Sequence, residues 1–220
     1  DPWTPSFRIV LRGDVPWPVF PWGPDGFEDE QPLVELEDGS YRAGEDPLGP
    51  ERVSTHVADV RDAAAVERAI RDFTGRTEGR LDAVFANAGV LFMGPHETIT
   101  PAQKQLLVDV NVSGAVQTID AALPFLQRTP GAHVVAMSST SAEYGAPQHA
   151  VYSATKFFVR GYTEALDIEY RRQGINVCGI YVAYVDTGMV RNAERKAASI
   201  ETMGVKARPE DVAAIVWRAV

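Results

Sequence analysis

From Val53 to the end of the chain, apolar segments typical of strands alternate with segments typical of helices. Strand-like stretches cover 53–60, 81–86, 132–137 and 175–185, and helix-like stretches cover about 62–77, 100–126, 151–174 and 208 onward. Because a helix separates each strand from the next, the strands are expected to be parallel. The pattern predicts an α/β fold with a doubly wound parallel sheet and helices on both of its faces.

The ends of the expected helices carry recognisable capping residues. Asp62 can cap the first helix, and Thr100-Pro101-Ala102-Gln103 combines a capping box with proline at the first helical position. Gly174 is a typical stop signal after a helix, and Arg208-Pro209-Glu210-Asp211 begins the last one. These local signals agree with the hydrophobic pattern on where the helices lie.

Residues 1–52 have a different composition from the rest of the chain, with nine of the 15 prolines and three of the four tryptophans. The run from Pro16 to Pro24 cannot form an α-helix, because proline removes backbone donors and clashes with the preceding turn. Phe7–Leu11 is a candidate strand, and residues 33–36, Asp38-Gly39 and Tyr41 predict a hairpin. We expect a single domain over 1–220, with an atypical Pro/Trp-rich N-terminal segment at 1–52 and the α/β core at 53–220.

The charge of the chain argues against several kinds of partner. The 220 residues have a formal net charge of −9, which leaves no basic stripe to neutralise nucleic acid phosphates. We find no apolar window long enough for a membrane span, and no signal-peptide pattern at the N-terminus. The single cysteine, Cys178, suits a reducing compartment. We therefore expect a cytoplasmic protein that binds neither nucleic acid nor membrane.

The four histidines give no sign of a metal site. His56, His96, His133 and His149 have no pair at metal-ligand spacing, and no cysteine cluster supports them. His149 lies just before Tyr152 and could line a pocket there, but the sequence favours a loop position at the surface.

A tyrosine, a lysine and a serine in the second half of the chain have the chemistry needed to move a proton to or from an alcohol oxygen. Tyr152 and Lys156 are four residues apart on one face of a helix, and Ser139 follows the strand before it. A free tyrosine has a pKa of about 10, and an ammonium about 4 Å away contributes about 4 kcal/mol at an effective dielectric of about 20. We expect this to lower the tyrosine pKa by roughly three units, so that Tyr152 can act as general acid and base. Ser139 would donate a hydrogen bond to the same substrate oxygen.

Asn111 is informative because asparagine is a poor choice inside an apolar helix unless its amide has a partner. Together with these residues, the chain from about residue 48 to 220 resembles the short-chain dehydrogenase/reductase (SDR) family. The matching motifs are Asp59-Val60, Asn87-Ala88-Gly89, Asn111, Ser138-Ser139, Tyr152-x-x-x-Lys156 and Val185-Asp186-Thr187. A lone Tyr-x-x-x-Lys pair occurs by chance on many helices, whereas six motifs in this order are specific.

The resemblance implies a Rossmann-like fold and a nicotinamide cofactor, NAD or NADP. It implies that Lys156 holds the nicotinamide ribose, that Asp59 faces the adenine ring and that Asn111 holds a water linking Lys156 to solvent. The implied catalytic residues are Asn111, Ser139, Tyr152 and Lys156. The implied cofactor-binding residues are Asp59, Val60, Asn87, Ala88, Gly89, Tyr152, Lys156, Val185 and Thr187. The region that would distinguish NAD from NADP follows the second strand of the family, where this chain departs from the pattern.

Each motif also has a simpler explanation when taken alone. Tyr152 and Lys156 could be an amphipathic surface pair, and Ser139 an ordinary serine at the end of a strand. The segment 87–89 could be only a tight exit from a strand, and Asp59 could cap a turn.

The N-terminal part departs from the family pattern. The family opens with a strand and a Thr-Gly-x-x-x-Gly-x-Gly turn at the cofactor pyrophosphate, and no grouping of glycines in residues 1–52 fits this motif. In a doubly wound sheet the first two strands lie between the third and the fourth, so the strand at 53–60 cannot join the one at 81–86 unless something fills that place.

Three explanations of this departure are open. Residues 1–52 could supply the missing strands through an unusual hairpin, or they could be a misread or engineered leader in place of the true start. Alternatively, the protein has lost cofactor binding and kept the fold. The change of composition near residue 48 favours the leader.

The other end of the chain also departs from the family. Val182-Ala183 stands where the family has Pro-Gly beside the nicotinamide. The chain stops at Val220, before the family's usual last strand, which often supports subunit contacts. We therefore expect a truncated C-terminal end, and a homo-oligomer is compatible with the sequence.

Two functions are consistent with these residues. The first is an NAD(P)-dependent oxidoreductase that interconverts a secondary alcohol and a ketone, with a small alcohol or carbonyl compound as substrate. The second is a non-catalytic SDR-fold binding or scaffold protein that has lost the cofactor phosphate site. Several large side chains would surround the substrate pocket or simply pack around it: Phe92, Met93, Tyr144, Tyr184, Met189 and Met203.

Overall fold

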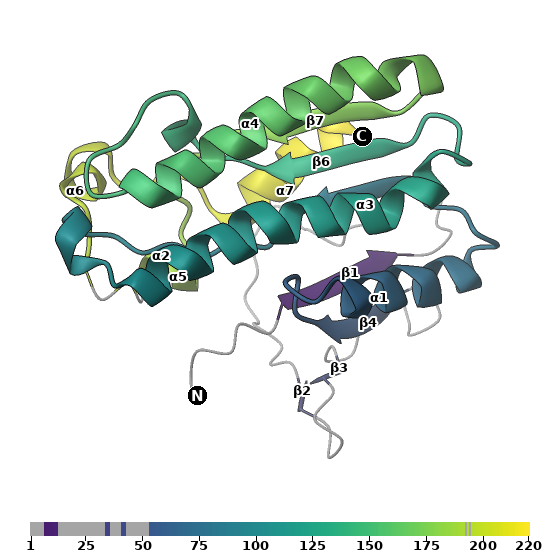
Figure 1. Ribbon diagram of the computed structural model, residues 1–220, viewed down its shortest axis with the longest axis horizontal. Coiled ribbons are helices and arrows are strands. Elements are labelled where there is room, and N and C mark those ends of the chain that lie inside the picture. The colour runs from purple at the N-terminus through teal and green to yellow at the C-terminus, as the bar shows by residue number, and fades with distance from the viewer. Residues whose placement is uncertain (1–6, 13–33, 36–40, 43–52, 192, 194) are drawn as a thin grey trace.

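Strands and helices alternate along the chain as the sequence pattern predicts. The structure is a computed structural model that describes residues 7–12, 34–35, 41–42, 53–191, 193 and 195–220 (Figure 1). The strands are β1 (Phe7–Arg12), β2 (Val34–Glu35), β3 (Tyr41–Arg42), β4 (Val53–Ala58), β5 (Ala83–Ala86), β6 (His133–Met137) and β7 (Asn176–Ile180). The helices are α1 (Ala63–Arg76), α2 (Pro101–Val108), α3 (Ala115–Leu126), α4 (Ala150–Tyr170), α5 (Gly188–Arg191), α6 (Ala198–Met203) and α7 (Pro209–Ala219). Shorter helical turns are η1 (His96–Thr98), η2 (Asp109–Gly114), η3 (Thr140–Ala142) and η4 (Arg171–Gln173).

A parallel sheet in the order β5-β6-β7 forms the centre of the fold. Val84 on β5 pairs with Val134 on β6, which in turn pairs with Val177 on β7. Helices α3 and α4 cover one face of this sheet and α7 covers the other, while α1 packs against α3 and lies over β1 and β4 (Figure 1). The predicted α/β fold, with a parallel sheet between helices, is thus confirmed.

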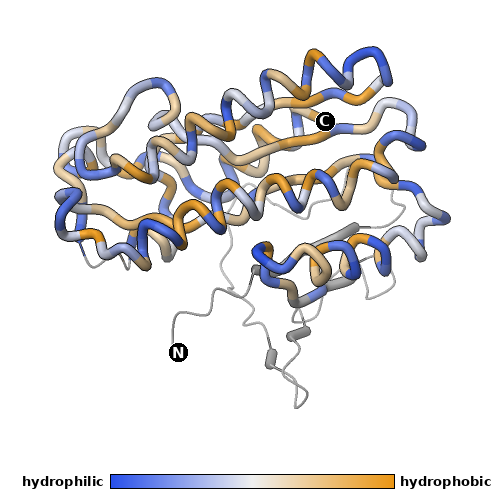
Figure 2. The backbone as a smooth tube through the Cα atoms, viewed as in Figure 1, coloured by the Kyte–Doolittle hydropathy of each residue, from blue (hydrophilic) through white to orange (hydrophobic). Residues whose placement is uncertain are grey.

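The two faces of β6 build two apolar cores because successive side chains of a strand point in opposite directions. Val134 and Ala136 pack with the helices α1, α3 and α4, whereas Val135 packs with Val212 of α7. Figure 2 shows that β6, β7 and the long helix ending in α3 are mainly apolar, while apolar and hydrophilic positions alternate along α1. This division explains why β6 reads as a continuous apolar run in the sequence.

The strand β4 pairs outside the central sheet. It runs antiparallel to β1, with Ile9 opposite His56, and β2 and β3 form a separate antiparallel pair. No strand among the described residues joins β4 to β5, which agrees with the inference that something must fill the place between them. The predicted strand at Phe7–Leu11 is confirmed by β1. The run Pro16–Pro24 and the Asp38-Gly39 turn lie outside the described residues.

The helix predicted over 100–126 is continuous but changes its pitch in the middle. The Thr100 hydroxyl accepts a hydrogen bond from Gln103 N, and Gln103 Oε1 accepts one from Thr100 N, which confirms the capping box. The turn η2 is π-helical and contains Asn111. π-Helical turns are rare in proteins, and those that occur are often found at functional sites.

Among the described residues, this helix is the one segment that is long and apolar enough to cross a membrane, over Pro101–Leu126. The expectation that no window reaches this length is therefore wrong by length and composition. Ile119, Ala122 and Leu126 of this helix are buried in the core against the sheet. Packing within the fold accounts for its apolar composition.

The C-terminal half follows the predicted bounds with one exception. The helix α4 is followed by η4 and by Gly174, whose φ of 75° confirms it as a stop after the helix. The strand predicted to reach residue 185 ends at Ile180, because the chain leaves the sheet there. Val185 makes only an isolated parallel bridge to Ala207.

Candidate active site

The residues predicted from the sequence gather where the parallel strands end. Asn87-Ala88-Gly89 follows β5, and Ser138-Ser139 follows β6. The first turns of α4 carry Tyr152 and Lys156. Loops at the carboxyl ends of strands are the usual binding position in open α/β sheets. The topology thus brings segments more than 60 residues apart to one edge of the sheet.

Lys156 is buried with its ammonium close to the end of β6. Its side chain is 4% exposed, and Nζ donates a hydrogen bond to Met137 O at 2.8 Å. Nζ lies 5.7 Å from the centroid of the Tyr152 ring. Burial lowers the pKa of Lys156 to about 8, because the charged form loses its hydration.

The pKa of Tyr152 shifts in the opposite direction from the sequence-based prediction. Burial raises the pKa of this phenol to about 12, and the hydrogen bond with Ser139 only partly opposes the shift. The predicted lowering assumed an ammonium about 4 Å from the phenol oxygen. In the structure the Lys156 ammonium bonds to Met137 O instead, and desolvation of Tyr152 is the largest cause of its pKa shift. Tyr152 therefore stays protonated at neutral pH.

Ser139 lies between β6 and the turn η3. Its hydroxyl accepts a hydrogen bond from Ser141 N at 3.1 Å, and the residue is buried. The neighbouring Ser138 hydroxyl donates to Lys156 O at 3.4 Å. These bonds place Ser139 beside the first turns of α4.

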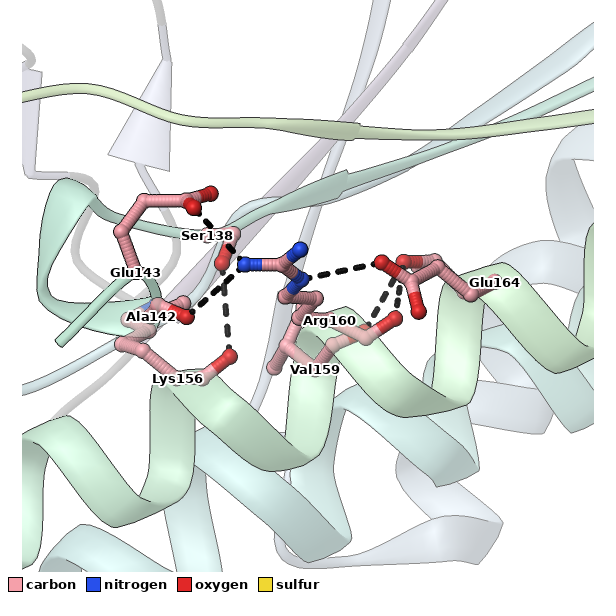
Figure 3. Close-up of polar contacts among 8 residues, drawn as sticks. Ser138, Ala142, Glu143, Lys156, Val159, Arg160 and Glu164 are labelled. Carbon is pink, nitrogen blue, oxygen red and sulfur yellow. Dashed lines mark hydrogen bonds and ion pairs between the residues drawn. The ribbon is translucent and has the colours of Figure 1, made fainter.

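Arg160 holds the following turn against α4, as Figure 3 shows. One guanidinium nitrogen donates to Glu143 Oε2 at 2.8 Å and to Ala142 O at 3.3 Å, and another donates to Glu164 Oε1 at 2.9 Å. Arg160 lies one turn after Lys156 on the same helix. The segment that carries Ser139 is thus tied to α4 on both sides.

Asn111 has the partners that a buried amide requires. It is 1% exposed, its Oδ1 accepts from Val90 N, and its two N–H groups donate to Val90 O and to Thr155 Oγ1. The implied water linking Lys156 to solvent would have to use the remaining acceptor capacity of Oδ1. Thr155 also donates to Tyr152 O at 2.7 Å. The sequence analysis missed Thr155, although it lies inside the Tyr-x-x-x-Lys motif.

Gly89 leaves space beside the ammonium. A Cβ added at this glycine would lie 3.4 Å from Asn111 Oδ1 and 3.7 Å from Lys156 Nζ. Asn87 is exposed and Ala88 is half-buried. This arrangement joins Gly89 to the group formed by Asn111, Ser139, Tyr152 and Lys156.

Four further predicted residues lie on neighbouring segments. Asp59 pairs with Arg61 at 2.5 Å, which lowers the pKa of its carboxyl group, and Val60 is buried against Gly114. Thr187 N donates to Val185 O at 2.8 Å within one turn. No recorded hydrogen bond or ion pair of the described residues links these four to Tyr152 or Lys156. Their predicted contacts with a cofactor stay predictions.

His149 is not the surface residue that the sequence favours. It is 3% exposed, and its ring centroid lies 6.0 Å from that of Tyr152. The prediction was wrong because it considered only the loop composition. The backbone of His149 begins α4, where its carbonyl accepts from Ser153 N at 2.7 Å, and the centroid of the Tyr184 ring lies 6.1 Å from that of His149.

The residues around Lys156 fit the nicotinamide end of a dinucleotide. The ammonium has three N–H donors, of which Met137 O accepts one, and the side-chain-free Gly89 lies beside it. Within the part of the chain that the structure describes, no glycine-rich turn corresponds to a phosphate site. The same residues contain no group of three or more His, Cys, Asp or Glu that could hold a metal ion.

A separate groove lies between α1 and α3, on the side of the fold away from these residues. Its volume is about 630 Å³, and Arg71, Glu78, Asp120 and Arg128 are among its lining residues. None of the predicted site residues borders it.

Sequence comparison places the chain among known proteins. The family model for short chain dehydrogenases matches residues 42–198, so the chain belongs to the short chain dehydrogenase family. It is 33% identical over 147 residues to the oxidoreductase UcpA of Escherichia coli (strain K12), covering 66% of this chain and 56% of that protein. It is 30% identical over 154 residues to the 3-ketodihydrosphingosine reductase of Bacteroides thetaiotaomicron, covering 70% of this chain and 56% of that protein. The chain thus spans little more than half the length of these relatives.

Solved structures share the same fold. A 3-ketoacyl-(acyl-carrier-protein) reductase from Brucella melitensis, complexed with NADH, has a TM-score of 0.66 at 25% identity, over 75% of this chain and 70% of that one. A gluconate 5-dehydrogenase from Burkholderia cenocepacia J2315, in complex with NADP and tartrate, has a TM-score of 0.64 at 25% identity, over 72% of this chain and 64% of that one. Both similarities extend over most of the chain and confirm the Rossmann-like architecture.

Proposed function

We propose that this protein is an NAD(P)-dependent oxidoreductase that interconverts a secondary alcohol and a ketone. One observation supports this most strongly: the half-buried Tyr152 lies with the buried Ser139 and Lys156 at the carboxyl edge of the parallel sheet. A single domain over 1–220 would carry this activity, and we expect it to act in the cytoplasm.

Tyr152 would transfer the proton. With a pKa of about 12 it is a phenol at neutral pH, so it can donate its proton to a carbonyl oxygen during reduction. Ser139 would hydrogen-bond the same oxygen and fix its position. The positive charge of Lys156 would stabilise the tyrosinate as it forms, and this charge is present below a pH of about 8.

A bound nicotinamide would supply or accept the hydride. Lys156, with Gly89 beside it, would hold its ribose, and Asn111 would keep the surrounding segments in place. The remaining residues of the cofactor site would be Asp59, Val60, Asn87, Ala88, Val185 and Thr187. The two solved relatives carry NADH and NADP respectively, which makes both cofactors candidates.

The alternative is a non-catalytic family member. The absence of the glycine-rich phosphate motif from the sequence favours it, since that motif binds the cofactor pyrophosphate in the family. Calorimetric titration with NADH and NADPH separates the two functions. Micromolar binding supports the oxidoreductase, whereas no binding at millimolar cofactor supports the non-catalytic protein.

Replacing Tyr152 tests the mechanism directly. Tyr152→Phe removes only the hydroxyl, so turnover of a panel of ketones with NADH or NADPH should fall at least about 100-fold. The dissociation constant of the cofactor should stay within about twofold. Tyr170→Phe is the matched control, because Tyr170 is the last residue of α4, at the opposite end of this helix from Tyr152. Turnover by Tyr152→Phe at the unmodified rate would refute the proposed mechanism.

A further inference from the structure

A chain of side chains connects α6 to the proposed catalytic tyrosine. The Tyr184 hydroxyl lies 2.6 Å from Ser199 Oγ on α6 and 3.4 Å from His149 Nε2. The His149 ring is near two tyrosine rings, with centroid distances of 6.0 Å to Tyr152 and 6.1 Å to Tyr184. Figure 1 shows α6 at the end of the molecule where α4 begins.

The partners of His149 determine the direction of each hydrogen bond. His149 Nδ1 lies 3.1 Å from Pro147 O, and since a carbonyl only accepts, Nδ1 carries the proton. Burial lowers the pKa of His149, so the ring is neutral and Nε2 can only accept. The Tyr184 hydroxyl therefore donates to His149, and Ser199 donates to Tyr184. Each of these two hydroxyl groups thus donates its hydrogen to one acceptor.

The residue before His149 ties the same segments a second time. Gln148 Oε1 accepts from Ala198 N at 3.1 Å, and Gln148 O accepts from Gly94 N at 3.0 Å. Gln148 has a φ of 64°, which is uncommon for a residue other than glycine. Residues 148 and 149 thus fix both α6 and the segment after β5 beside the first turn of α4.

We propose that His149 and Tyr184 are positioning residues that hold α6 beside Tyr152 as the wall that places the substrate. This role rests on the proposed oxidoreductase function. His149 and Tyr184 transfer no proton to the substrate, so their loss changes substrate binding rather than the chemical step. In this proposal Tyr184, one of the residues expected around the substrate pocket, acts by holding α6 in place.

Limited proteolysis reports whether α6 is held. Lys196 is exposed and Ala197 is 1% exposed, so trypsin reaches the bond between them only when this segment leaves its position. Tyr184→Phe and Ser199→Ala should each speed cleavage after Lys196 about fivefold to tenfold, the effect of one lost hydrogen bond. Tyr170→Phe, at the far end of α4, should leave the rate unchanged. His149→Gln, which keeps an acceptor, should speed cleavage less than His149→Leu.

Steady-state kinetics then test the effect on the substrate. In Tyr184→Phe the KM for a ketone that the unmodified protein reduces should rise about fivefold or more. The kcat and the dissociation constant of NADPH or NADH should stay within twofold. Unchanged cleavage and unchanged KM would overturn the proposal, and so would faster cleavage with an unchanged KM. If the unmodified protein reduces no ketone, the oxidoreductase function and the substrate role both fail. The cleavage rates would still show whether the contacts among His149, Tyr184 and Ser199 hold α6 in place.

Discussion

The side-chain amide of Asn111 pairs with both backbone groups of Val90. Oδ1 accepts from Val90 N at 2.8 Å and Nδ2 donates to Val90 O at 3.0 Å, in the manner of a neighbouring strand. The second N–H of the amide donates to Thr155 Oγ1 at 3.1 Å. One residue in a π-helical turn thus joins the segment after β5 to α4, and the site around Lys156 depends on this connection.

Replacing Asn111 by an apolar residue of similar size should destabilise the fold. Asn111→Leu leaves the N–H and C=O groups of Val90 without these partners, which should lower the free energy of unfolding by about 2–4 kcal/mol. Urea unfolding followed by circular dichroism measures this change. The exposed Asn87 provides the control, since Asn87→Leu should cost less than about 0.5 kcal/mol. Equal midpoints for both variants would contradict the structure.

The contact between Gly114 and Val60 should appear as coupling between two substitutions. A Cβ added at Gly114 would lie 2.6 Å from Val60 Cγ2, closer than packing allows. Gly114→Ala should therefore lower stability by about 1–3 kcal/mol, although alanine has the better helix propensity. Combining it with Val60→Ala should cost less than the sum of the two single changes. Gly161→Ala in α4 has nothing within 4 Å and should stabilise instead.

A methyl group at Gly89 should interfere with the cofactor without disturbing the fold. The added Cβ would take the space 3.7 Å from Lys156 Nζ, at ordinary contact distance from its neighbours. We expect Gly89→Ala to weaken NADH or NADPH binding about tenfold, while the midpoint of thermal unfolding changes little. Gly145→Ala, where no atom lies within 4 Å, should change neither quantity. Equal cofactor affinity in both variants would argue against a ribose site at Gly89.

The buried Lys156 should make stability rise with pH in one window. Its pKa is about 8 in the folded protein and 10.5 in the reference state, so between these values the unfolded chain binds the extra proton. Stability should therefore increase as pH rises from about 8 toward 10.5, and the penalty of a buried ammonium should be fully present below that window. Lys156→Met should remove this rise, as measured by urea unfolding at several pH values. A parallel pH course in both proteins would disprove the buried ammonium.

Tyr152 should make stability fall with rising pH, opposite to the effect of Lys156, in a higher pH range. Its pKa is about 12 when folded and 10.0 in the reference state, so the folded protein holds the extra proton between these values. The part of the free energy of unfolding that comes from the protonated Tyr152 should be fully present below about pH 10. It should be lost as the pH rises toward 12. Comparing the unmodified protein with Tyr152→Phe across this range isolates the effect. Burial also raises the pKa of Tyr162 to about 12, so spectrophotometric titration should show these two tyrosines ionising late. Tyr152→Phe should remove one of the two, and an unchanged late amplitude would contradict the assignment.

Features that depend on near neighbours along the chain could be predicted from the amino-acid sequence. Asp62, the Thr100–Gln103 box and Gly174 mark helix ends because a cap satisfies backbone groups within three or four residues. Tyr152 and Lys156 share a helix face for the same reason, since helical spacing is local. The alternation of strands and helices was enough to predict the parallel sheet.

Features that depend on segments far apart in the sequence became known only from the folded chain. The antiparallel partner of β4, the burial of His149 and the partners of Asn111 all come from residues more than 20 positions away or from another element. The upward pKa shift of Tyr152 has the same origin, because burial depends on which elements surround the phenol. Spacing specifies which groups can meet, whereas desolvation and hydrogen-bond partners are known only once the chain has packed.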